Sequence, residues 1–353
     1  MSGIARGFRY EWEKLIHDWQ RTISLLVLLL FMVAIPLVAC FIYMGAGASG
    51  VFGSTAWTDE TEAHYLDLQS NALLYYEIAI GKAQWPEGSV SFPLDAAEQW
   101  RRYLYFTFVL SVKRIDFYSG FSLSGYPLDP QSGYGNDPHL AASRLFFFQN
   151  LAFMAIPVLF AVNVHRVFIE DRSSGFEKNY RSMGVDPNSL FRGKLVFSAL
   201  SCLGATFFFF LVGLVFIDGE PMAVFDGSFH LTSVALVYFE RWLIMIIVLS
   251  PFFAFDVLVA FLPKSQRYFL TLALGAALSL FPSFGYYSQN LSTSLKQGYL
   301  IHFPLYGFLA CDGFRSTGVL EVVGWPILMA LLMGALAFLM NSRCFKKNER
   351  NPA

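Results

Sequence analysis

Six long apolar runs constrain this chain more than any other feature of its sequence. Each holds few or no charged residues, and they lie at about 22–44, 145–167, 195–217, 242–262, 268–288 and 321–341. A helix needs about 20 apolar residues to cross a hydrocarbon core of about 30 Å. Because irregular backbone is too costly in lipid, we expect an all-α integral membrane protein with six membrane-spanning helices.

The composition agrees with this prediction. Of the residues, 55% are hydrophobic and 14% are charged, whereas a soluble domain carries about 25% charged residues. The run at 22–44 is longer than a signal-peptide core of about 7–15 apolar residues, so we expect it to be retained although "GAGASG" follows it. The net charge of -1, with no basic stripe, argues against a nucleic-acid partner.

Basic residues predict the orientation. They concentrate in the N-terminal segment, the connections after the second and fourth runs, and the tail 342–353: Arg6, Arg9, Lys14, Arg21, Arg166, Arg172, Lys178, Arg181, Arg192, Lys194, Lys264, Arg267, Arg343, Lys346, Lys347 and Arg350. Positive charge favours the cytoplasmic side. We expect a multi-pass protein of the cell membrane, in a bacterial plasma membrane, with both termini cytoplasmic and with 45–143, 218–241 and 289–320 outside.

The first 21 residues predict an amphipathic helix at the membrane surface. Large apolar side chains share one stripe: Phe8, Trp12, Leu15, Ile16 and Trp19. Four charged residues lie off that stripe: Glu11, Glu13, Lys14 and Asp18. Tryptophan suits headgroup depth, so residues 1–21 are expected to form an elbow against the first span. A cytoplasmic helix packed on a partner protein remains the alternative.

The polar segment 168–194 predicts two helix starts. Ser174 and Glu177 fit a capping box, and Gly184 suits the end of a helix of about two turns. Asp186 is a good N-cap before Pro187, so a second helix should begin there and run into the third span.

The short helix 174–184 carries an aromatic face. Phe176, Tyr180 and Met183 share it, and Glu177 pairs with Arg181 at a favourable spacing. An isolated helix this short is marginal in water, which favours docking in a groove of another protein. A surface helix that only returns the chain to the membrane is the alternative.

The first outer loop, 45–143, is expected to be largely helical. Apolar and aromatic residues recur at helical spacing between Thr58 and Lys82, and a second helix fits Ala96 to Tyr118. The apolar run 103–112 is about half a crossing, so we place it in a core or membrane-resting helix. If it did cross, every later loop would change sides.

Several motifs occur in an order that resembles a known family. The segment between the second and third runs reads E-x-R-x-x-G-x-E, from Glu170 to Glu177, followed by Gly193-Lys194. A Pro-centred outer stretch with Pro304 and Arg315 precedes the last run, and "NSRCFKKNE" is a basic terminus. With the elbow and the long outer loop, these features resemble the membrane subunits of the ABC type-2 permease family of ATP-driven exporters, over most of the chain apart from 45–143.

The resemblance implies a coupling role for the polar segment. It implies that residues of the segment contact an ATPase: Glu170, Arg172, Gly175, Phe176, Glu177, Tyr180 and Arg181. Gly193 and Lys194 then mark the start of the third span. The elbow residues Phe8, Trp12 and Trp19 would move with the spans.

No ATPase motif is present. Gly81-Lys82 and Gly193-Lys194 lack the upstream glycine and the following hydroxyl of a phosphate-binding loop. The chain is therefore not expected to be an enzyme or to bind a cofactor directly. By resemblance, ATP and Mg²⁺ belong to an ABC ATPase subunit present in two copies, and a second membrane subunit, identical or homologous, completes the exporter. The expected cargo is hydrophobic, peptide or lipid-like.

Metal chemistry has little support. The cysteines, Cys40, Cys202, Cys311 and Cys344, show no C-x-x-C spacing, so buried thiols are expected. No H-E-x-x-H occurs. His165, Glu170 and Asp171 are the one cluster that suggests a metal or acid-base site, and solvated charge is the expected explanation.

Charge inside a span is more informative. Asp256 falls within 242–262, where a carboxylate costs about 2.5–3.5 kcal/mol on insertion scales. It should face the bundle interior, a partner or water, either lining a pathway or making a structural hydrogen bond. Glu240 and Arg241 are expected at the outer edge of that span, paired with headgroups.

Two other classes of function remain open. One is a non-transporting sensor, immunity or interaction protein whose outer domain binds a ligand. The other is a membrane enzyme with a site in the outer loop.

Overall fold

The computed structural model describes residues 3–47, 57–86, 94, 96–114, 118–119, 141–170, 186–217, 221–225, 227–262 and 319–350. Three predicted features lie wholly or mostly outside these ranges: the helix 174–184, the span 268–288 and the outer segment 289–320.

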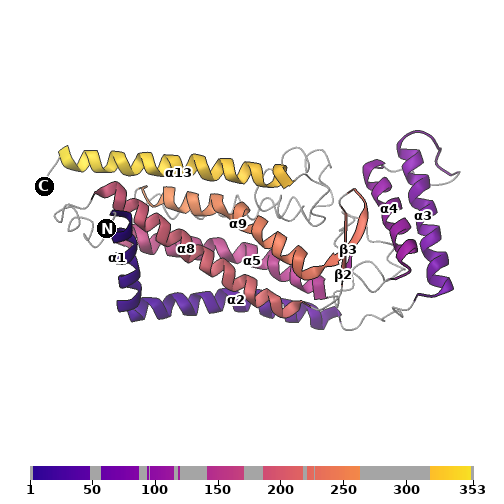
Figure 1. The fold of residues 1–353 in the computed structure, drawn as a ribbon, viewed down its shortest axis with the longest axis horizontal. Helices are drawn as coiled ribbons and strands as arrows, with labels where there is room; N and C mark the ends of the chain where they lie inside the picture. Colours follow the sequence, from indigo (N-terminus) through magenta and orange to yellow (C-terminus); the bar gives the residue numbers. More distant parts are fainter. Residues whose placement is uncertain are drawn as a thin grey trace.

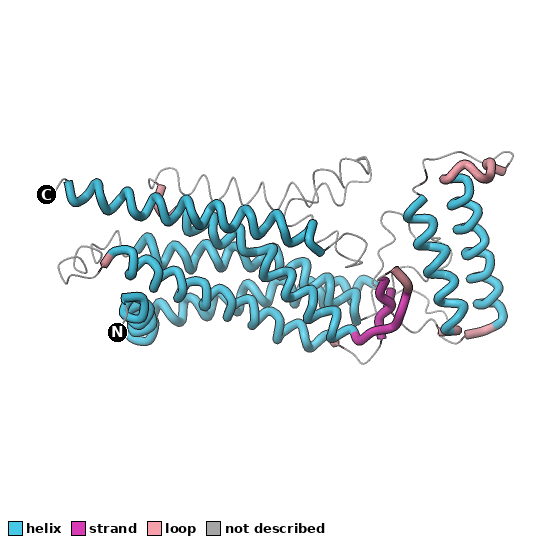
Figure 2. Tube along the Cα trace, turned by 45° about the horizontal axis from the view of Figure 1, so that its top comes forward, coloured by secondary structure: helices cyan, strands magenta, loops and turns pink. Residues whose placement is uncertain are grey.

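Five long helices form a bundle along the long axis of the molecule (Figures 1 and 2). They are α2 (Trp19–Gly47), α5 (Ala141–Val164), α8 (Pro187–Gly213), α9 (Val234–Val259) and α13 (Val319–Arg350). Each is long and apolar enough to cross a membrane, over Thr22–Phe41, Phe148–Ile169, Asn188–Phe216, Val234–Val259 and Val323–Asn341. The chain is thus a mostly helical, multi-pass membrane protein, and these five stretches overlap five of the six predicted runs.

The helices differ in how much of their surface the protein itself covers. The main core is built around α5 and α9, with Phe148, Ile156, Val248 and Leu249 almost fully buried. Along α2 and α13, by contrast, large apolar side chains such as Phe31 and Leu331 are exposed. Apolar side chains are stable on a surface that faces hydrocarbon, so α2 and α13 form the outer faces of the bundle.

One end of the bundle is crossed by α1 (Gly3–His17), and we call it the α1 end (Figure 1). The helix is interrupted at Asp18, and α2 begins at the next residue. The hydroxyl of Thr22 donates a hydrogen bond of 2.5 Å to the carbonyl of Leu15, which joins the two helices at this corner. Both chain termini lie at this end (Figure 1).

The opposite end carries a helical hairpin made of α3 (Asp59–Ala79) and α4 (Ala96–Val112). These are the two helices predicted for the outer loop. Thr58 accepts a hydrogen bond from the amide of Thr61 and caps α3, whereas α4 stops at Lys113, whose φ is 52°. The run 103–112 belongs to α4, which packs on α3 and is not among the helices long and apolar enough to span a membrane.

A small sheet lies between the bundle and this hairpin (Figure 1). It orders β1 (Tyr118–Ser119), β2 (Pro221–Phe225) and β3 (Phe229–Ser233) with β1 parallel to β2 and β2 antiparallel to β3. Gly227, at φ 101°, makes the tight β2–β3 turn. The stretch predicted as an outer loop, 218–241, contains this β-hairpin, and α9 begins at Val234, eight residues before the predicted start of the span.

Candidate functional site

The α1 end is held first by a contact between two backbones. At Gly193 of α8, an added Cβ would lie 2.8 Å from the Cα of Gly7, the carbonyl oxygen of Ile4 and the amide nitrogen of Phe8. All three atoms belong to the α1 backbone, which cannot rotate away as a side chain can. Only glycine at position 193 therefore lets α1 cross α8 this closely.

Lys194 lies next to this contact and joins three elements. Its ammonium donates a hydrogen bond of 3.1 Å to the carbonyl of Val167, and it lies 3.8 Å from Oε1 of Glu11. Lys194 is 6% exposed and Glu11 is 3% exposed. The other oxygen of Glu11 lies 3.9 Å from Nζ of Lys14. One buried carboxylate is thus neutralised by two lysines, which links α1 to α8 and to the end of α5.

Val167 belongs to a π-helix, η1 (His165–Glu170), that continues α5. π-helical turns are rare and occur often at functional sites. Here the π-helix ends at Glu170, the first of the predicted coupling residues. Lys194 of α8 therefore holds in place the helix η1, which leads into the predicted coupling segment.

On the far side of the predicted coupling segment, the first described residue is Asp186, which caps the start of α8. Its carboxylate accepts hydrogen bonds from the hydroxyl of Ser189 at 2.8 Å and from the amides of Ser189 and Asn188 at 3.0 and 3.4 Å. The Ser189 hydroxyl is the main reason why the pKa of Asp186 is lowered from its ordinary value. The predicted N-cap with Pro187 in the first turn is confirmed.

Aromatic packing completes the junction. Phe8 meets Phe197 of α8 edge to face, with ring centroids 5.7 Å apart. Phe191 lies 5.7 Å from both Phe168 of η1 and Phe261, which follows α9. These rings belong to one buried cluster that joins α1, η1, α8 and the ends of α9 and α13.

The predicted elbow residues divide between two faces. Phe8 is half-buried against α8, whereas Trp12 and Trp19 are 51% and 68% exposed. Glu11, expected on the polar face, is instead buried against Lys194, because the small residue Gly7 one turn earlier brings this face of α1 onto α8. Among the predicted coupling residues, only Glu170 is described, as the last residue of η1; Arg172, Gly175, Phe176, Glu177, Tyr180 and Arg181 lie outside the described residues.

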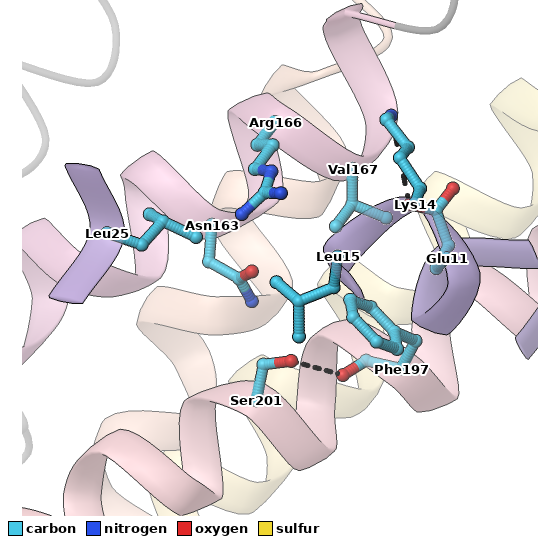
Figure 3. A pocket seen from close by; sticks show the side chains of 9 residues that line it. All are labelled: Glu11, Lys14, Leu15, Leu25, Asn163, Arg166, Val167, Phe197 and Ser201. Atoms are coloured by element: carbon cyan, nitrogen blue, oxygen red, sulfur yellow. Dashed lines mark hydrogen bonds and ion pairs between the residues drawn. The ribbon is translucent and has the colours of Figure 1, made fainter. Parts of the chain in front are cut away.

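A cavity of about 160 Å³ opens between α1, α2, α5, η1 and α8 (Figure 3). Its lining combines charged, polar and apolar side chains: Glu11, Lys14, Leu15, Leu25, Asn163, Arg166, Val167, Phe197 and Ser201. Figure 3 shows Arg166 and Asn163 on one wall and the Glu11–Lys14 pair on the other, with Leu15 between them.

Asp256 faces the interior, as its position in a span predicts. It is 9% exposed. Between α5 and α8, the amide of Asn163 donates to the carbonyl and hydroxyl of Ser198 at 3.1 and 3.0 Å, and to Sγ of Cys202 at 3.4 Å. These three side chains form a polar patch between the two helices.

Arg241 is buried inside the bundle, which the sequence did not predict. It is 1% exposed, and Nη2 donates a hydrogen bond of 3.3 Å to Oδ1 of Asn150. Its predicted place among headgroups is wrong because α9 begins at Val234, which puts Arg241 two turns inside the helix. The adjacent tryptophan and tyrosine, Trp242 and Tyr238, pack on Phe210 rather than at a free helix end.

Among the described residues, no three His, Cys, Asp or Glu side chains are grouped to hold a metal ion. No family model, curated protein or solved structure matches the chain. The function is therefore inferred from the geometry of the α1 end.

Proposed function

We propose that this chain is the membrane subunit of an ATP-driven exporter of the ABC type-2 permease kind, moving a hydrophobic, peptide or lipid-like substrate. The observation that carries the proposal is the junction at Lys194, which binds the carbonyl of Val167 and pairs with Glu11. It ties η1 and α8, the two helices that bound the segment 171–185, to α1. A segment that receives force from a partner can pass it on only if the helices on either side of it are held firmly.

The described helices supply a route for that force. The segment 171–185 is bounded by η1, which continues α5, and by α8. Both helices run unbroken from the α1 end to the sheet end (Figure 1). A push on the coupling residues would move α5, α8 and α1 together as a rigid body, which is one established way to switch a membrane pathway between two openings.

The rest of the assembly follows from what this chain lacks. Without a phosphate-binding loop, ATP and Mg²⁺ are handled by two copies of a separate ATPase on the cytoplasmic side, which we assign to the α1 end. A second membrane subunit, identical or homologous, shares the exposed apolar faces of α2 and α13 with lipid. The connectivity supports a sixth crossing at 268–288, since α9 ends at the α1 end whereas α13 begins at the opposite one (Figure 1).

Copurification tests this function. The full chain, tagged and solubilised from its own host, is expected to capture an ATPase, and the double variant Phe176→Ala/Tyr180→Ala is expected to lose it together with export. Trp100→Ala, an exposed aromatic at the opposite end of the molecule, is the matched control and should retain both.

Two results would overturn the proposal. One is a wild-type chain that captures no ATPase under conditions that preserve its fold, which would favour a sensor or interaction protein. The other is an epitope tag inserted after Gly184 that antibodies reach only from outside intact cells, because a cytoplasmic motor then has no access to the segment.

A further inference from the structure

The cavity at the α1 end has the size and the chemistry of a small ligand site. Its volume of about 160 Å³ is below the range of about 300–1,000 Å³ typical for drug-sized ligands. A polar group of several heavy atoms fits it, and a whole lipid does not. The apolar side chains of Leu15 and Leu25 line the same cavity.

Charge in and beside the cavity favours an anion. Lys14 and Arg166 line it, and Lys194 lies 3.8 Å from Glu11, the carboxylate among the described lining residues. Two lysines share Glu11, and the guanidinium of Arg166 lines the same cavity. A planar guanidinium matches the oxygens of a phosphate group in a bidentate arrangement.

The lining also offers hydrogen-bond acceptors. The amide nitrogen of Asn163 is engaged by Ser198 and Cys202, so its carbonyl oxygen is the atom left for a ligand. The hydroxyl of Ser201 donates to the carbonyl of Phe197, which leaves its oxygen as an acceptor. A ligand that carries hydroxyl donors beside a phosphate would satisfy both sets of groups.

The neighbouring surface of α1 indicates where such a ligand comes from. Trp12, Ile16 and Trp19 are exposed apolar residues of α1 and the start of α2, and such side chains favour the level of lipid headgroups. Basic pockets between membrane helices bind anionic headgroups in this position.

We propose that this cavity binds the headgroup of phosphatidylglycerol, with the phosphate on Arg166 and Lys14 and the glycerol hydroxyls donating to Asn163 and Ser201. The glycerol backbone and acyl chains would lie outside the cavity, starting along Leu15 and Leu25. The site needs only a membrane surface at the α1 end, so it does not depend on the proposed transport function.

Lipid binding to the full chain in neutral detergent tests the proposal. Native mass spectrometry and the thermal unfolding midpoint are measured with phosphatidylglycerol, with phosphatidylcholine of the same acyl chains, and with inorganic phosphate alone. We expect phosphatidylglycerol to bind and stabilise most, and inorganic phosphate to leave the midpoint unchanged. Lys14→Gln and Arg166→Gln should each weaken phosphatidylglycerol binding about fivefold, as expected for the loss of one basic contact to an anionic lipid.

Arg9→Gln is the matched control, because Arg9 is a basic residue of α1 that pairs with Glu13 on the exposed side. It should bind phosphatidylglycerol as the wild type does. Equal binding of both lipids, or equal losses in Arg9→Gln and Lys14→Gln, would overturn the proposal. Full stabilisation by inorganic phosphate would show a free-anion site instead. If Arg166→Gln does not fold, Lys14→Gln and the wild-type lipid comparison still decide.

Discussion

The α1 end and the α3–α4 hairpin, at opposite ends of the molecule, are each stabilised by a different kind of interaction. At the α1 end, Gly193 admits a backbone-to-backbone contact and Lys194 is paired inside the protein. In the α3–α4 hairpin, Tyr65 stacks on Trp57 at 5.9 Å and packs on Phe106 at 6.1 Å, while the ion pair of Lys113 and Glu62, at 3.0 Å, is exposed. The α1 end therefore depends on a few contacts with exact geometry, whereas the hairpin depends on the total apolar area that its aromatic side chains bury.

This difference matters for how each end responds to change. A buried charge whose partner is removed is left uncompensated, whereas an exposed one is taken over by water. Aromatic packing in the hairpin extends to the sheet through Phe229, 5.4 Å from Tyr105 and 6.0 Å from Phe108. We expect the α1 end to tolerate few substitutions and the hairpin to unfold locally without the bundle.

The largest expected effect is at Lys194. Lys194→Met removes both the hydrogen bond to Val167 and one partner of Glu11, which should lower the free energy of unfolding by about 3–5 kcal/mol, as for other broken buried pairs. Unfolding in mixed micelles measures it. The double variant Glu11→Gln/Lys194→Met should be more stable than Lys194→Met alone; equal or greater loss would mean that Glu11 is not the partner that matters.

Phe106→Ala tests the hairpin. Phe106 is buried between α3 and α4, and its truncation should cost the hairpin about 3–5 kcal/mol. Hydrogen exchange of α3 and α4 should accelerate while that of α5 and α9 stays unchanged. Faster exchange in the bundle as well would show that the two regions unfold as one.

Gly193→Ala should destabilise the α1 end by about 1–3 kcal/mol, the usual cost of overpacking, because the α1 backbone has to move. Gly204→Ala is the control on the same helix, since nothing lies within 4 Å of its added Cβ. That variant should be as stable as the wild type or more so, given the better helix propensity of alanine. Equal stability of both variants would contradict the close crossing.

A smaller effect is expected from the cap of α8. Asp186→Ala removes the carboxylate that accepts hydrogen bonds from Ser189 and Asn188, at about 1 kcal/mol. Asp186→Asn should retain most of the stability because asparagine also caps helices. A loss as large for asparagine as for alanine would mean that the charge matters more than the hydrogen bonds.

The smallest effect concerns the pH dependence of the hairpin. Hydrogen bonds from Lys113 and then Trp57 lower the pKa of Glu62 from its ordinary value of 4.5. A lowered carboxylate pKa stabilises the fold above the ordinary value, and this contribution is lost as pH falls through the folded pKa. Protection of α3 from hydrogen exchange should therefore weaken below about pH 4.5, and less so in Lys113→Met. Identical profiles for both chains would contradict the role of this pair.

Much of the fold follows from local patterns. The apolar runs are long enough to identify the spanning helices, because length and hydropathy alone decide what lipid accepts. Thr58 and Asp186 cap α3 and α8, since a cap depends on residues within one turn. The β-hairpin at Pro221–Ser233 was missed because a short apolar strand next to a longer apolar run has no separate period.

The candidate site depended less on local pattern. The sequence pointed to the pair Gly193-Lys194 only by resemblance, and it placed Glu11 on a solvated face. No spacing along α1 says which side of the helix meets α8. Arg241 was misplaced for the related reason that the start of α9 depends on the strand before it.

The sequence by itself determined that this chain enters a membrane, which of its described stretches can cross it, and where α3 and α8 start. The tertiary structure decided that Glu11 and Lys194, 183 residues apart, share one buried site, and that Arg166 faces a cavity beside Lys14. The hydropathy of a stretch is a sum over neighbouring residues, so it is the same however the helices pack. A charge pair is a distance between two distant segments, and only the packing of α1 on α8 sets it.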